Sequence, residues 1–314
     1  MNGQPLVTVA TVSFNSSRYI RDAIESVLAQ TYTNIEYIIG DDGSTDDTWD
    51  IINEYQDARI KSYRNEKNLG EYINRNKAID RATGKYFIFI DGDDIIFPHG
   101  VGYFVGMMED FPEVGMAIQK NYYNNILYPA LFRPEETLRN HFYGKDNLLS
   151  SSFASDFFKT SLLKQWKLST KYITGDEEIR LKIALHFPVL FVAGWVTWPR
   201  ETPGQASKKV DVIKGLEESY LFTGEIMSMA ASAEIEPALV EDIRATKKKR
   251  LARLLLNLFR RGDIAQAQGL LKRTSFSWKE VLKYVNYVPV FQDILLTHSA
   301  DHPFKRGFLA GQKR

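Results

Sequence analysis

Two groups of aspartates follow apolar segments, and the first contains Asp41 and Asp42 after residues 35–40. Carboxylates at such a place can accept hydrogen bonds from a ligand or bind a cation. Asp-Gly-Ser is also ordinary turn chemistry, so a plain turn is the favoured interpretation of residues 41–47 taken alone.

The second group contains Asp91, Asp93 and Asp94, which follow the apolar residues 86–90. Three carboxylates this close repel one another unless a cation or a bound ligand offsets their charge. Such oxygen ligands suit Mg²⁺ or Mn²⁺, whose remaining coordination comes from phosphate oxygens and water. The pattern therefore favours a metal site, and a solvated loop is the alternative.

These groups need elements to position them, and strand and helix patterns alternate over the first 90 residues. β-Branched and apolar runs predict strands, and apolar residues at helical spacing predict helices. The helix ending at residue 82 is expected to stop at Gly84 in a left-handed conformation. The predicted strands are 6–13, 35–40, 60–63 and 86–90, and the predicted helices are 19–30, 48–55 and 72–82.

Such alternation predicts an α/β fold, with a mostly parallel sheet flanked by helices on both faces. Ligands of these sheets bind at the carboxyl ends of the strands. Both aspartate groups fall there.

The last third of the chain has a helical pattern, with charges between leucines. Leu251, Leu254, Leu255 and Leu258 share one helical face, and Gly262 marks a stop. We expect residues 1–207 to form one domain and residues 208–314 to form a C-terminal helical appendage.

Composition excludes several classes of protein. With 44% hydrophobic and 25% charged residues, the chain can bury a full core. Its net charge of +1 predicts no global attraction to nucleic acid. Cysteine is absent, which excludes thiol catalysis and cysteine-ligated metal. The first residues resemble no signal peptide and no apolar run of membrane-spanning length occurs, so we expect a cytoplasmic protein.

Five segments in order make a specific resemblance. They are VTVATVSFN, SVLAQTYTNIEYIIGDDGSTDDT, NLGEYINRNKAIDRATGKYFIFIDGDD, TGDEEIRLKIAL and RETPGQAS. Over about two thirds of its length the chain resembles the inverting family-2 glycosyltransferases of bacterial surface polysaccharide synthesis. The resemblance implies the Rossmann-like GT-A fold. It also implies transfer of a sugar from a UDP-sugar donor to a saccharide acceptor.

For the nucleotide, the resemblance implies that Thr11 lines the base pocket and that Asp41 or Asp42 accepts a hydrogen bond from the imide N–H of uracil. Arg75 and Asn76 match the family's Arg-Asn pair near the nucleotide.

For the metal, Asp91 and Asp93 match the family's DxD motif. Asp91 would face the ribose or a metal-bound water, and Asp93 would bind the Mn²⁺ or Mg²⁺ ion that bridges the diphosphate. That ion would neutralise charge on the leaving group.

The general base should lie in TGDEEIRLKIAL. The family places a basic residue six positions after the base, and Asp176 with Lys182 fits that register. In an arbitrary sequence, Asp176 would sooner be a helix N-cap. In this context it would deprotonate the acceptor hydroxyl.

Arg200 would clamp the diphosphate, because its fork of donors suits phosphate oxygens. Thr202 stands where many relatives have histidine, which leaves a third protein ligand to the metal in doubt. Gln205 and Ser207 would contact phosphate, with a polar turn as the alternative.

Further features concern the acceptor and the membrane. Trp195 and Trp198 could border an acceptor cleft or pack in the core. Seven positive charges lie between Lys247 and Arg261, with no acidic residue. This segment could lie on the inner face of the cell membrane, where a lipid-linked acceptor such as a capsule or O-antigen precursor would be met. The alternative is an amphipathic helix packed on the catalytic domain.

Two other functions compete with sugar transfer. A catalytically inactive protein that binds nucleotide sugar or carbohydrate would keep the same pockets. A sugar nucleotidyltransferase would need a glycine-rich loop after the first strand, but the loop here, SFNSSRYI, has no glycine.

Overall fold

The computed structural model describes residues 3–120, 128–144, 147–202 and 211–284. By the density of internal contacts, the chain divides into two compact units. The first contains residues 1–138 and 149–205, and the second contains 139–148 and 206–314. The predicted division after residue 207 falls between 203 and 210, outside the described residues, and stays a prediction.

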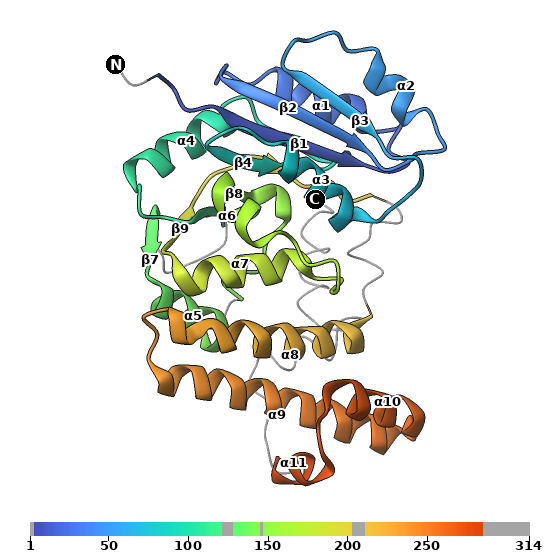
Figure 1. Ribbon diagram of the computed structural model, residues 1–314, viewed down its shortest axis with the longest axis vertical. Coiled ribbons are helices and arrows are strands. Elements are labelled where there is room, and N and C mark those ends of the chain that lie inside the picture. Colours follow the sequence, from blue (N-terminus) through green and yellow to red (C-terminus); the bar gives the residue numbers. More distant parts are fainter. Residues whose placement is uncertain (1–2, 121–127, 145–146, 203–210, 285–314) are drawn as a thin grey trace, which may run out of the picture. The chain divides into compact units, whose positions relative to one another are not determined.

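An eight-stranded sheet forms the centre of the first unit (Figure 1). The first four strands of this order are parallel, as are β6 and β9, whereas β8 and β7 run antiparallel to their neighbours. In order, the strands are β3 (Ile60–Arg64), β2 (Ile35–Asp41), β1 (Val7–Ser13), β4 (Tyr86–Phe89), β8 (Asp156–Lys159), β6 (Met116–Gln119), β9 (Val189–Val192) and β7 (Ala130–Phe132).

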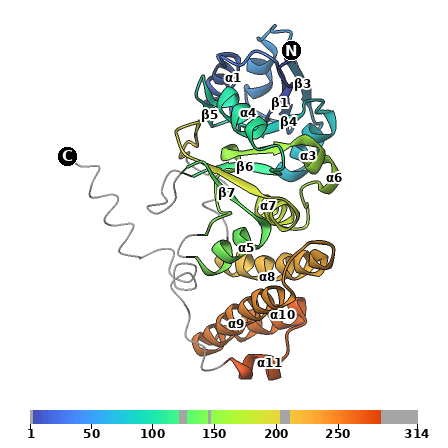
Figure 2. The same ribbon diagram turned by 90° about the vertical axis from the view of Figure 1, so that its left-hand side faces the viewer.

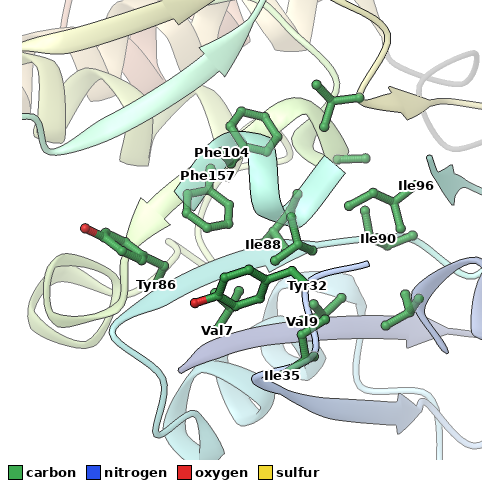
Figure 3. Packing of buried hydrophobic residues seen from close by; sticks show 14 of the residues in the cluster. Val7, Val9, Tyr32, Ile35, Tyr86, Ile88, Ile90, Ile96, Phe104 and Phe157 are labelled. Carbon is green, nitrogen blue, oxygen red and sulfur yellow. The ribbon is translucent and has the colours of Figure 1, made fainter. Parts of the chain in front are cut away.

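Helices cover both faces of this sheet (Figure 2). On one face, α1 (Ile20–Leu28) and α4 (Gly100–Asp110) pack on alternate residues of the central strands. Figure 3 shows this cluster, in which the rings of Phe104 and Phe157 stack with centroids 5.0 Å apart. On the other face lie α3 (Glu71–Arg81), α6 (Thr160–Trp166) and α7 (Gly175–His186). Because both faces are covered, β1, β2 and β4 are buried at every residue.

The strands and helices predicted for the first 90 residues are confirmed, with α2 at Thr48–Asn53. The expected role of Gly84 is wrong. It is absent from the glycines with positive φ, and α3 already ends at Ala82, whose ψ of 137° is extended. Gly84 is needed for another reason, since a Cβ there would lie 2.6 Å from the backbone nitrogen of Thr8.

A two-stranded ribbon stands beside the main sheet. It pairs β5 (Ile95–Ile96) with β10 (Thr197–Trp198) in antiparallel orientation. The ribbon brings the segment after residue 198 next to the aspartates that precede β5.

The second unit is helical. Its long helices are α8 (Val212–Ser228) and α9 (Pro237–Arg261), and α10 (Ile264–Thr274) and α11 (Trp278–Lys283) pack against α9 (Figure 2). It also includes the end of α5 (Pro134–Tyr143). Gly262 has a φ of 84°, as expected of a helix stop. None of the helices in the described ranges has the length and hydropathy needed to cross a membrane.

The predicted leucine stripe of α9 is buried within this helical unit. Leu251, Leu254, Leu255 and Leu258 form one cluster with residues of α10 and α11. The partner of the stripe is therefore found among the neighbouring helices.

Candidate active site

The two aspartate groups meet at one edge of the sheet. β1 lies between β2 and β4, and all three are parallel, so the segments after β2 and β4 emerge on the same side. The backbone N–H of Asp42 donates to Ser13 O, and that of Gly92 donates to Val12 O. The end of β1 thus holds both groups, as the sequence predicts.

Asp41 and Asp42 are buried and already engaged by the protein. Asp41 accepts hydrogen bonds from the N–H and hydroxyl of Ser44, and its Oδ2 lies 3.2 Å from Arg64 Nε. Asp42 accepts bonds from Asn65 Nδ2 at 2.8 Å and from the backbone N–H groups of Leu69 and Gly70. These contacts shape the turns at the strand end. The predicted contact with uracil stays a prediction.

Thr11 has no exposed surface, and its hydroxyl lies 2.8 Å from that of the buried Tyr37. The next polar residue of β1, Ser13, ends the strand beside Gly92. The base-pocket role expected of Thr11 stays a prediction.

Burial and mutual repulsion disturb the aspartates after β4. Burial, with a contribution from Asp91, raises the pKa of Asp93. Burial and the charge of Asp91 also raise the pKa of Asp94 to about 8. Thr202 Oγ1 donates to Asp93 Oδ2 at 2.9 Å, and the backbone N–H of Arg200 donates to Asp94 Oδ1 at 2.9 Å. These two donors are neutral and add no positive charge to the group.

A divalent cation fits this group. A cation would offset the repulsion that raises both pKa values, and oxygen-only ligands suit Mg²⁺ or Mn²⁺. Across the described parts of the chain, no three His, Cys, Asp or Glu side chains are arranged to hold a metal ion by themselves. An ion bound by Asp91 and Asp93 would take its other ligands from phosphate oxygens and water.

Arg75 is the cation nearest to this group. Its guanidinium forms an ion pair with Asp91 at 2.8 Å and lies about equally far from the rings of Phe89 and Phe153, with centroid distances of 4.9 and 5.0 Å. Burial lowers the pKa of Arg75, but Asp91 and Glu71 more than offset this and raise it. Its Nε and Nη1 have no hydrogen-bond partner among the described residues. Both atoms are buried, so these two donors are unsatisfied in the structure.

The neighbouring Asn76 is used differently. Its amide donates to Leu168 O at 2.8 Å and accepts from Leu168 N at 2.9 Å. It holds the chain after α6 against α3, and its predicted place near the nucleotide stays a prediction.

Asp176 is the second residue of α7, and the helix N-cap is Thr174. The Asp176 carboxylate accepts a hydrogen bond from Tyr72 OH at 3.2 Å and one from Arg180 Nη1 at 2.9 Å. Although burial raises its pKa, the charge and hydrogen bond of Arg180 lower it overall. With 29% of its side chain exposed, Asp176 is an ionised carboxylate that a substrate can reach. Lys182, which set the register, pairs instead with Glu178.

Arg200, the residue predicted to bind the diphosphate, contacts other side chains in the structure. Arg200 Nη2 lies 2.8 Å from Asp22 Oδ2, and its guanidinium lies 4.9 Å from the ring centroid of Tyr19 and 5.7 Å from that of Trp198. Its role on the diphosphate stays a prediction. Gln205 and Ser207 lie outside the described residues.

Two predicted aromatic positions lie at the surface. Trp195 is 57% exposed and Trp198 is 48% exposed. This agrees with a border position and not with core packing.

Sequence reasoning missed Tyr72, Asp156 and Arg180, which surround Asp176. The spacing of four between Asp176 and Arg180 on a helix is a signal that could have suggested their contact. Nothing in the sequence links Asp156 or Tyr72 to Asp176, because they lie on β8 and α3.

Comparisons with known proteins identify the family and the fold. The profile described as "Glycosyl transferase family 2" matches residues 8–166. The chain is 47% identical over 95 residues to the putative teichuronic acid biosynthesis glycosyltransferase TuaG of Bacillus subtilis, covering 30% of this chain and 38% of TuaG. It is 47% identical over 89 residues to WfaP of Escherichia coli, a UDP-Glc:alpha-D-GlcNAc-diphosphoundecaprenol beta-1,3-glucosyltransferase, covering 28% of this chain and 36% of WfaP. The chain thus spans less than two fifths of the length of either relative.

Solved structures share the fold. TarS of S. aureus in complex with UDP superposes with a TM-score of 0.60 at 22% identity, over 78% of this chain and 71% of that chain. The mannosyltransferase PcManGT from Pyrobaculum calidifontis, in complex with GDP-Man and Mn2+, superposes with a TM-score of 0.57 at 15% identity, over 96% of this chain and 89% of that chain. The predicted GT-A fold is confirmed.

Proposed function

Because the chain belongs to glycosyl transferase family 2, we propose that it transfers a sugar from a UDP-sugar donor to a saccharide acceptor with inversion at the anomeric carbon. The observation that supports this most is the position of Arg75. It pairs with Asp91 of the acidic group, and its charge also acts on Asp176. The candidate metal ligands and the candidate base therefore share one charged neighbourhood at the edge of the sheet.

In the proposed reaction, Asp91 and Asp93 would hold Mn²⁺ or Mg²⁺, and such an ion would supply positive charge to offset the charge of the departing diphosphate. Arg75, whose buried Nε and Nη1 have no partner among the described residues, is the candidate cation for the donor's phosphates. An ionised Asp176 accepts the proton of the acceptor hydroxyl as that oxygen attacks the anomeric carbon. The bond between this carbon and the diphosphate oxygen breaks, and its electron pair leaves with UDP.

The proposed acceptor is a growing surface polysaccharide such as a capsule or O-antigen, attached to a lipid carrier. WfaP and WfgD of Escherichia coli are named for acceptors on diphosphoundecaprenol. Such an acceptor would bring this protein to the inner face of the cell membrane, from the cytoplasm.

Binding of UDP tests the metal part of this proposal. We expect calorimetry to show at least about tenfold tighter UDP binding with Mn²⁺ than with a chelator, because the carboxylates and the diphosphate repel each other without a cation. Asp93→Ala should lose this metal dependence and its turnover while keeping its melting temperature. Thr45→Ala, on the exposed rim of the neighbouring turn, should behave as wild type. Equal UDP affinity with and without divalent ion would contradict the proposal.

Turnover distinguishes an enzyme from a binding protein. Release of UDP from a panel of UDP-sugars, with GDP-mannose as a comparison, should occur with at least one UDP-sugar. Tight binding of a donor without hydrolysis or transfer to any saccharide would favour the inactive binding protein.

A further inference from the structure

Arg180 is a fully buried cation with three acceptors around it. Its Nε donates to Asp156 Oδ2 at 2.6 Å, its Nη1 to Asp176 Oδ2 at 2.9 Å, and its Nη2 to Ser151 O at 3.1 Å. Only 1% of its side chain is exposed. Burying a guanidinium is costly unless its charge is paired and its donors are bonded. The two carboxylates and the carbonyl meet that requirement here.

The far side of Arg180 is anchored in the sheet. Asp156 begins β8, has no exposed surface, and also accepts a hydrogen bond from Ser151 Oγ at 2.9 Å. The ring of Phe153 lies against the guanidinium, with its centroid 5.5 Å from Arg180 Cζ. The guanidinium therefore has one position, set by β8 and not by α7 alone.

The near side of Arg180 restrains Asp176. One carboxylate oxygen of Asp176 faces Arg180, and the other faces Tyr72 OH on α3. Gly175 permits this approach, because a Cβ there would lie 3.1 Å from the ring of Tyr72 and 2.8 Å from Ser169 O. Tyr72 OH also lies 3.0 Å from Ile173 O, so Arg180 makes the stronger of the two contacts that orient the carboxylate.

We propose that Arg180 is a positioning residue for the transfer reaction: anchored by Asp156 and Ser151, it fixes the direction of the Asp176 carboxylate and keeps that carboxylate ionised. This inference rests on the proposed role of Asp176 as the base. It assigns to Asp156 the role of neutralising Arg180, so that Arg180 and its two carboxylates form one buried chain of charges.

Several charged groups act on Asp176. Arg180 is the strongest, followed by Arg75 of α3, which also pairs with Asp91, and the neutral Tyr72 adds a hydrogen bond. Glu71 of α3 and Asp156 of β8 are the carboxylates whose charge interacts with Asp176. If Arg180 is removed, burial and these carboxylates favour the protonated form, which cannot accept the acceptor's proton.

The pH dependence of kcat tests this at saturating donor and acceptor. The double variant Asp156→Asn/Arg180→Met removes both ends of the buried pair, so that no unpaired charge stays in the core. We expect the acid limb of its kcat–pH profile to lie at least about one pH unit above that of the wild type. At pH values above this limb, its kcat should recover to within about tenfold of the wild-type kcat. Arg180→Lys should shift the acid limb less, because lysine keeps the positive charge although it lacks the planar guanidinium group.

The control is Lys182→Met, which removes a cation of α7 that pairs with Glu178 and not with Asp176. Its acid limb should stay at the wild-type pH. Melting temperature and UDP affinity, measured on every variant, show that each is folded and binds donor.

Two outcomes separate the inference from the proposed function. If Asp176→Asn keeps its turnover, Asp176 is not the base and the proposed mechanism fails. If Asp176→Asn is inactive while the folded double variant has the wild-type pH profile, only the role of Arg180 is overturned. A loss of kcat in the double variant that is the same at every pH also overturns the proposed role of Arg180, because that pattern indicates a structural role.

Discussion

At the scale of single residues, two adjacent carboxylates, Asp176 and Glu177, are the candidates for the base. Asp176 is bonded to Tyr72 and Arg180 across the first turn of α7. Glu177 follows it and points about 100° away around the helix axis. Only one of them can face the anomeric carbon, and the assignment of that role to Asp176 stays a prediction.

Exchanging each carboxylate for its amide tests this register. We expect Asp176→Asn to keep UDP affinity and metal dependence and to lose about 10²–10⁴-fold in turnover, the usual cost of removing a general base. Glu177→Gln should lose less than about tenfold. The measurement is sugar transfer at saturating donor, with UDP binding in parallel. An inactive Glu177→Gln beside an active Asp176→Asn would move the base to Glu177.

At the scale of elements, Glu36 ties together the amino-terminal ends of the strands, at the edge opposite to the site. Its carboxylate accepts hydrogen bonds from Thr8 of β1, from Lys61 of β3 and from Thr83 and Gly84, which precede β4. Burial alone would raise its pKa, but the bonds from Lys61, Thr8 and Thr83 lower the pKa to about 2. Glu36 is therefore ionised whenever the protein is folded near neutral pH.

Replacing Glu36 tests this connection through stability. A carboxyl whose folded pKa lies below its unfolded pKa stabilises the fold above the unfolded value, and the stabilisation disappears as pH falls through the folded value. We expect Glu36→Gln to unfold in urea with about 2 kcal/mol less free energy at pH 7. The difference should shrink between about pH 4.5 and 2, where wild-type Glu36 takes up its proton.

The matched control is Glu54→Gln, which breaks only the exposed pair with Arg21. Such pairs contribute little, so its urea midpoint should stay near that of the wild type. If Glu36→Gln lowers the free energy of unfolding by the same amount at every pH, the shape of the side chain and not its charge matters at this position.

At the scale of the whole molecule, the basic segment between Lys247 and Arg261 is only partly available to a membrane. Lys247 is buried, with its Nζ 2.6 Å from Ser219 Oγ, and Lys248 Nζ lies 3.7 Å from Glu280 Oε1. Arg260 and Arg261, at the end of α9, are exposed. Peripheral contact with anionic lipid, if the proposed acceptor requires it, should depend on these two arginines.

Vesicle binding tests this assignment. Binding to vesicles that contain phosphatidylglycerol should weaken steeply with salt, because a screened surface attraction must. Arg260→Gln/Arg261→Gln should reduce it several-fold, by about 1 kcal/mol per charge. Lys248→Gln, whose charge already faces Glu280, should reduce it less. Binding that is absent or insensitive to salt would leave α9 with the single role of packing in the helical unit.

The first half of the fold and the place of the site follow from the sequence alone. Apolar runs alternating with helical periods specify parallel strands, and parallel strands bring Asp41, Asp42, Asp91 and Asp93 to one edge. These are local patterns, and local hydrophobic periodicity determines secondary structure well. The register that assigns the base to Asp176 also came from the sequence, and it stays a prediction.

Only the tertiary structure decided which partner each functional side chain has. Asp156 and Arg180 meet across 24 residues, and Tyr72 reaches Asp176 across 104. The same packing buries Thr11. It also explains why residue 84 is glycine, since a Cβ there would collide with the backbone of Thr8. The physical reason is that burial and electrostatic pairing depend on distances in space. Spacing along the chain does not encode these distances once strands from separate segments stand side by side.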